Sequence, residues 1–82
     1  MKYSTPDINL AAFLWCQSEI LFEGTTKSGS RVFFKFKSES VSEGDLQTLL
    51  LDYSNGRTQV EPKNFCEKQT SLRGWLHNAR NV

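Results

Sequence analysis

The first part of the chain is apolar at almost every position, which predicts a helix that is buried on most sides. Between residue 8 and residue 18 the polar positions are few, and the apolar ones are Ile8, Leu10, Ala11, Ala12, Phe13, Leu14 and Trp15. An element with so little polar surface is typical of a helix at the centre of a core. Thr5 is the expected N-cap, because Pro6 suits the first helical position and Asp7 favours the positive end of the helix.

The next segment, residues 20–36, alternates with a period of two and predicts a β-hairpin. Ser28–Ser30 is the expected turn between its strands. The apolar pattern selects the register: pairing Lys27 with Arg31 places Phe22 opposite Phe36 and makes one face uniformly apolar. A three-residue loop satisfies this register, and a longer loop is the alternative.

Two further helices follow, each with local start signals. Ser42 and Asp45 form a sequence typical of a capping box, and Asn55-Gly56 stops the helix that they begin. The apolar stripe of that helix is Leu46, Leu49, Leu50 and Tyr53. Pro62 opens the last helix, in which Gly74 indicates a close backbone approach. Its expected inner face is Phe65, Cys66, Gln69, Leu72, Trp75, Leu76 and Ala79.

These elements predict an α+β fold in the order α-β-β-α-α, with an antiparallel hairpin packed against helices. A length of 82 residues suits a single domain over residues 1–82. Two strands alone make a marginal sheet, so helix packing must stabilise it. No apolar run approaches the length of a membrane span, and we expect no membrane association.

Charge is segregated along the chain, although the net charge is only +1. Residues 27–37 carry four bases and no acid, whereas residues 38–56 carry four acids and no base. Such a balance excludes a bulk polyanion binder and an acidic mimic of DNA, but it leaves room for a local basic surface.

The basic segment predicts a binding face on the second strand of the hairpin. If the even positions from Val32 face the core, the odd positions display cations around an aromatic ring, as sheets that bind single-stranded nucleic acid do. The candidate nucleic-acid-binding residues are Lys27, Arg31, Phe33, Lys35 and Lys37. Two simpler interpretations stay open: these cations are solvated residues that protect a strand edge, with Glu23 opposite Lys35, and a helix covers Phe33.

Few residues offer catalytic or metal-binding chemistry. Cys16, Cys66 and His77 lack the paired spacing of a zinc site, and no nucleophile–base spacing or phosphate-binding loop is present. We therefore expect no enzyme activity, no metal and no cofactor, and we interpret both cysteines as small buried hydrophobes with reduced thiols.

Several stretches, in order along the chain, resemble an uncharacterised family of small bacterial and phage-encoded domains, classed as a domain of unknown function. The resembling stretches are TPDINLAAFL at 5–14, RVFFKF at 31–36, DYSNG at 52–56, VEPKNF at 60–65, and the closing Leu72-Arg73 with Leu76-His77-Asn78. The resemblance implies a bacterial or phage cytoplasmic setting and supplies no catalytic residue. The chain departs from the family pattern in residues 38–42 and in its two cysteines.

Two functions remain as predictions for a monomeric or weakly dimeric binding module. The first is a nucleic-acid-associated accessory protein that uses the basic hairpin face on single-stranded nucleic acid. The second is a protein-binding module, for example a phage-encoded inhibitor of a host defence complex, with Trp75, Phe33 and Tyr3 as anchors.

Overall fold

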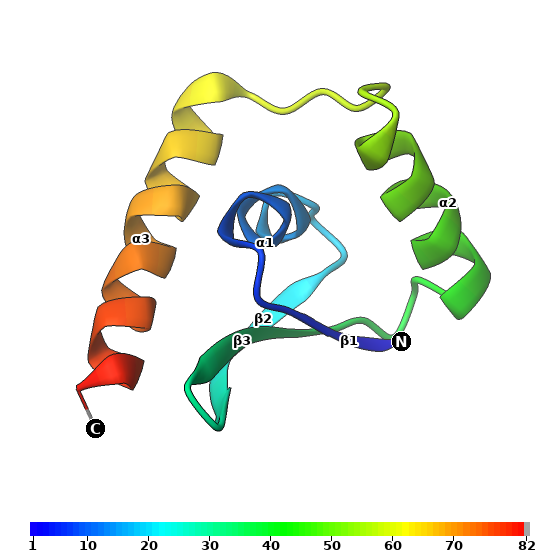
Figure 1. Ribbon diagram of the computed structural model, residues 1–82. Helices are drawn as coiled ribbons and strands as arrows, with labels where there is room; N and C mark the ends of the chain where they lie inside the picture. Colours follow the sequence, from blue (N-terminus) through cyan, green and yellow to red (C-terminus); the bar gives the residue numbers. More distant parts are fainter. Residues whose placement is uncertain (82) are drawn as a thin grey trace.

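The computed structural model describes residues 1–81 as an antiparallel sheet with helices on one side of it (Figure 1). The strands are β1 (Lys2–Thr5), β2 (Leu21–Ser28) and β3 (Arg31–Lys37), and the sheet order is β1-β3-β2. The helices are α1 (Ile8–Trp15), α2 (Glu43–Ser54) and α3 (Pro62–Arg80). Helix α1 lies between α2 and α3 (Figure 1). The predicted α+β class is confirmed, and the structure adds β1 before the first helix.

Strand β1 precedes the first helix and includes Thr5, which we expected to cap that helix. It pairs with β3, so that Lys2 lies opposite Lys37 and Thr5 opposite Phe34. The prediction that Thr5 caps α1 is wrong, because Thr5 is a buried residue of β1. Its hydroxyl accepts a hydrogen bond from the Asp7 N–H at 3.1 Å. Asp7 is the N-cap, and its Oδ1 accepts from the backbone N–H groups of residues 9 and 10.

The hairpin between β2 and β3 has a shorter loop than predicted. Ser28 pairs with Arg31 across the two residues Gly29-Ser30. Gly29 has a φ of +61° and Ser30 a negative φ, as a type II′ turn requires. This shifts the pairing by one residue near the turn, yet Phe22 lies opposite Phe36 as predicted. At a β-bulge between Phe22 and Gly24, two residues of β2 oppose one residue of β3. The bulge cancels the one-residue shift, so the predicted register holds from Phe22 onward toward the start of β2.

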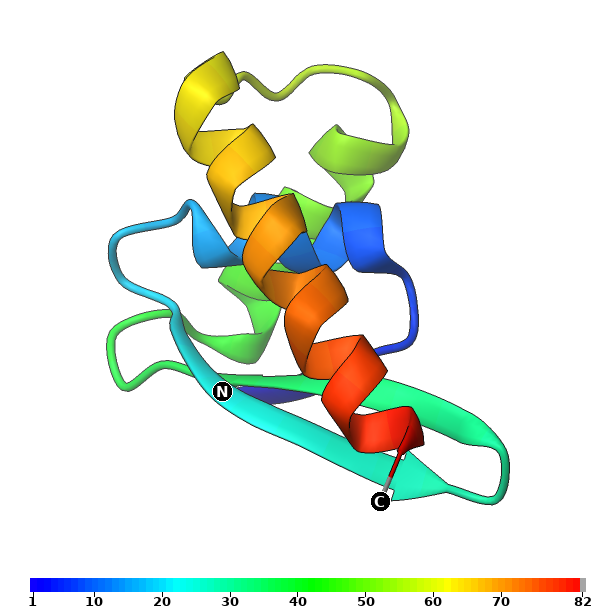
Figure 2. The ribbon, with the colours of Figure 1, turned by 90° about the vertical axis from the view of Figure 1, so that its left-hand side faces the viewer.

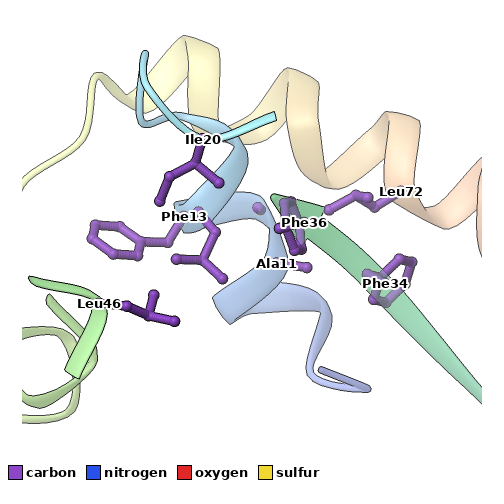
Figure 3. Close-up of a cluster of buried hydrophobic side chains, with 9 residues drawn as sticks. Ala11, Phe13, Ile20, Phe34, Phe36, Leu46 and Leu72 are labelled. Carbon is purple, nitrogen blue, oxygen red and sulfur yellow. The ribbon is translucent and has the colours of Figure 1, made fainter. Parts of the chain in front are cut away.

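The core surrounds α1, which packs against the sheet and against the other two helices (Figure 3). Strand β3 supplies Phe34 and Phe36, and α3 supplies Leu72; all three side chains are almost fully buried. Helix α1 contributes the largest part, namely Ala11, Ala12, Phe13 and Leu14. This agrees with the central position predicted for the first helix.

The last two helices begin as predicted and pack through narrow stripes. Ser42 and Asp45 form the capping box of α2, whose buried residue is Leu46. Glu61 caps α3, with Pro62 at its start. The expectation of a close approach at Gly74 is wrong. Apart from its two chain neighbours and the adjacent backbone of α3, no heavy atom of residues 1–81 lies within 4 Å of the position that a Cβ would take.

Candidate nucleic-acid interface

One face of the sheet is left open because the helices lie on the other face (Figure 2). Side chains alternate along a strand, so partners that lie directly opposite each other share a face. The buried Val32, Phe34 and Phe36 mark the helix-covered face. Their odd-numbered neighbours on β3 therefore belong to the opposite face, which we call the open face. From the pairing, it comprises Lys2, Ser4, Leu21, Thr26, Ser28, Arg31, Phe33, Lys35 and Lys37.

The alternation predicted for the second hairpin strand is confirmed. Arg31 and Lys37 are exposed, whereas Phe33 and Lys35 are half-buried. Phe33 is not part of the buried core and does not belong to the side chains packed against it in residues 1–81. Its register position therefore places Phe33 on the open face, whereas the helices lie on the other side of the sheet (Figure 2).

Four of the five predicted site residues come together on the open face, and Lys27 does not. Lys27 pairs with Val32, whose side chain faces the core, so its register position belongs to the helix-covered side of the hairpin. The predicted register had paired Lys27 with Arg31 and so had placed it among the outward cations. The two-residue turn accounts for the difference.

Lys2 also belongs to the open face, although its position in the sequence did not predict this. It lies opposite Lys37 on β1, and Ser4 lies opposite Lys35. With Arg31, these lysines give the face four cations. Residues 2–5 do alternate between exposed and at least partly buried positions, which is typical of a strand. Four residues are too few to predict a strand when its partner β3 is not known.

The bulge in β2 brings one acid to the open face. Glu23 Oε2 lies 3.7 Å from Lys37 Nζ, so its ion-pair partner is Lys37 and not the expected Lys35. Glu23 also borders a shallow depression of about 450 Å³ together with Lys2 and Lys35. With four cations and one carboxylate, the open face keeps a net charge of +3, which favours a polyanionic ligand.

Aromatic residues stiffen the helix-covered side of the hairpin. The Phe22 ring contacts Trp15 at a centroid distance of 4.6 Å and Trp75, edge to face, at 5.4 Å. The Trp75 residue of α3 is 45% exposed, although it contacts Phe22. Tyr3, the third anchor considered for a protein partner, packs against the core.

The cysteines differ in their surroundings. Both thiols are free; Cys16 is half-buried at the end of α1, but Cys66 is exposed, so the prediction that both are buried is wrong. Burial raises the pKa of the Cys16 thiol above its usual 9.0, although the nearby Lys68 acts in the opposite direction. Cys16 therefore stays protonated near neutral pH.

Residues 1–81 contain neither a metal-binding cluster nor a membrane-spanning helix. No three His, Cys, Asp or Glu side chains gather there in a way that could hold a metal ion. In the same part of the chain, no helix combines the length and the apolar character needed to cross a membrane.

Comparison with known proteins finds no similarity from which to infer a family. No protein-family model matches the chain, and neither a curated protein nor a solved structure matches it. The resemblance to small bacterial and phage-encoded domains therefore stays a prediction.

Proposed function

We propose that this chain is a nucleic-acid-associated accessory module that binds single strands on the open face of its sheet. One observation carries the proposal: the face without helices holds Phe33 among the cations Lys2, Arg31, Lys35 and Lys37. Cations contact backbone phosphates, and an aromatic ring between them stacks on a base. Single-stranded nucleic acid offers both groups at once, whereas the bases of a duplex are stacked inside it.

The two kinds of contact make different contributions to binding. Stacking of one base on Phe33 is worth about 1–3 kcal/mol. In a plot of the logarithm of the dissociation constant against the logarithm of the salt concentration, each phosphate contact adds about 0.7 to the slope. Four contacts therefore give a slope of about 3. The dissociation constant should then rise roughly 50-fold between about 50 and about 200 mM salt.

The proposal is tested by fluorescence anisotropy with a labelled oligothymidylate over a salt series. Phe33→Ala should weaken binding by about 1–3 kcal/mol without changing the salt slope. Lys35→Gln should weaken binding and lower the slope by about 0.7. Lys63→Gln is the matched control, because Lys63 lies at the start of α3 and outside the open face.

The results separate this function from the protein-binding alternative. Binding that ignores both Phe33→Ala and Lys35→Gln, or that shows no salt dependence, would overturn the proposal. A partner captured from a lysate after nuclease treatment, and lost on Trp75→Ala but retained on Phe33→Ala, would favour the protein-binding module instead. That outcome would assign the function to the exposed Trp75 on α3.

A further inference from the structure

A groove runs beside the open face, at the point where β1 stops pairing with β3. The last pair of these strands is Thr5 with Phe34, after which the chain turns away through Pro6. The groove beyond has a volume of about 430 Å³, and the residues that line it include Arg31, Arg80 and the buried Val32. It therefore joins the hairpin, the start of α1 and the end of α3.

The register directs a free backbone donor into this groove. Met1 and Ser38 exchange hydrogen bonds, and alternate residues of a strand direct their N–H and C=O groups to the same neighbour. By this alternation, Phe36, Phe34 and then Val32 also face β1. Val32 lies beyond the end of β1, and within residues 1–81 its backbone has no hydrogen bond to the Pro6–Asp7 segment that replaces the strand.

Asp7 cannot complete the ladder because its own groups are already bonded. Its N–H donates to the Thr5 hydroxyl, and its C=O accepts from the Ala11 N–H at 2.9 Å. A strand edge that no neighbouring strand covers leaves its N–H groups without protein acceptors, so the Val32 amide is available to an acceptor from outside the chain.

The charges around this amide favour an anion. Arg31 and Arg80 both border the groove, and among residues 1–81 the only acidic side chain in its lining is that of Asp7. One oxygen of the Asp7 carboxylate accepts two N–H groups at the start of α1, which partly compensate its charge. Two guanidinium groups and an amide N–H are the donors that bind phosphate oxygens.

We propose that this groove is a phosphate subsite that continues the open face, so that a bound single strand passes Arg31 and places a further phosphate between Arg31, Arg80 and the Val32 N–H. This inference rests on the proposed function, because it assumes a strand on the open face. Arg31 belongs to both surfaces, which makes the path continuous.

The subsite is tested with Arg80→Gln, which removes one charge from an exposed residue near the end of α3. The control is Arg57→Gln, since Arg57 belongs to the α2–α3 loop at the end of the molecule away from the sheet (Figures 1 and 2). For an oligothymidylate of about twelve nucleotides, we expect Arg80→Gln to weaken binding roughly fivefold and to lower the salt slope by about 0.7. Arg57→Gln should change neither quantity.

A second measurement reports on the backbone donor. On addition of the same oligothymidylate to the wild-type protein, the Val32 amide proton should move downfield in an NMR titration. The Phe34 amide, which is already paired with β1, should not follow it. In the Arg80→Gln variant, the Val32 shift should be smaller.

The outcomes distinguish the subsite from the function on which it rests. If Arg80→Gln binds like the wild type while Phe33→Ala and Lys35→Gln bind weakly, the subsite is wrong and the open-face function stands. An effect of Arg57→Gln as large as that of Arg80→Gln would also overturn the subsite, because it would show general charge attraction. If no variant changes binding, both proposals are wrong.

Discussion

Glu23 and Lys37 form an ion pair across β2 and β3, with 3.7 Å between the Glu23 Oε2 and the Lys37 Nζ. The bulge in β2 makes this contact, because Glu23 is the extra residue between Phe22 and Gly24. Both side chains are partly exposed, so the pair adds at most about 1 kcal/mol to stability. Its larger consequence is that one cation of the open face has a carboxylate beside it.

We predict that Glu23→Gln tightens the binding of single-stranded nucleic acid. At about 7 Å in water, a carboxylate repels a phosphate by about 0.6 kcal/mol, so its removal should lower the dissociation constant roughly threefold. Anisotropy titration at low salt measures the change, and thermal unfolding should show little loss of stability. Unchanged or weaker binding would show that the ligand does not approach Glu23.

The buried anchor of α2 should matter far more than the exposed leucine of the same helix. Leu46 is 1% exposed and belongs to the core, whereas Leu51 is 62% exposed. We expect Leu46→Ala to lower the free energy of unfolding by about 2–5 kcal/mol. Leu51→Ala, the matched control, should stay within about 0.5 kcal/mol of the wild type. Urea denaturation followed by circular dichroism gives both values; equal losses would contradict this packing of α2.

Two glycines should respond in opposite directions to the same substitution. Gly24, at the bulge, has a φ of +101°, so Gly24→Ala should destabilise the fold by about 1–3 kcal/mol. Gly74 lies inside α3 with open space around it, so Gly74→Ala should stabilise the fold by up to about 1 kcal/mol. Thermal unfolding of the two variants decides the point, and a stabilising Gly24→Ala would contradict the bulge.

Stability should fall at alkaline pH in part because of Tyr53. Burial raises the pKa of Tyr53 above its usual 10.0, and the nearby Asp7 carboxylate adds to the effect. The unfolded chain thus loses this proton at a lower pH than the folded chain. The stabilisation is complete below about pH 10 and is lost as pH rises through the folded pKa.

The Tyr53→Phe variant isolates this contribution. It keeps a ring against Phe13, whose centroid lies 4.9 Å from that of Tyr53, but it has no proton to lose. The free energy of unfolding, measured by urea denaturation on both sides of pH 10, should therefore decline less steeply for Tyr53→Phe than for the wild type. Parallel declines would contradict the raised pKa.

Elements with strong local signals were predictable from the sequence. The Ser42–Asp45 capping box forms as expected, and the alternation along β3 correctly separates Phe33 from Phe34. Both predictions depend on neighbours in the chain. Cap bonds span three residues, and side chains of a strand alternate whatever its partner is.

The missed features depend on contacts between distant segments. Four residues of β1 become a strand through their pairing with β3, 29 to 35 positions away, and Lys2 reaches the open face only for that reason. Local signals for the hairpin did exist: Gly29 suits the first position of a two-residue turn, and a glycine such as Gly24 inside a strand indicates a bulge. With a two-residue turn at Gly29 and a bulge at Gly24, Lys27 pairs with Val32 and is no longer a candidate residue of the open face.

The central claim is that a base stacks on Phe33 at the open face. Its most direct test is an NMR titration of the wild-type protein with oligothymidylate, in which the ring protons of Phe33 and of Phe34 are compared. We predict upfield shifts and intermolecular contacts to base protons for Phe33, and none for the buried Phe34. A Phe33 ring that does not respond, with base contacts at Trp75 or at no aromatic residue, would contradict the claim.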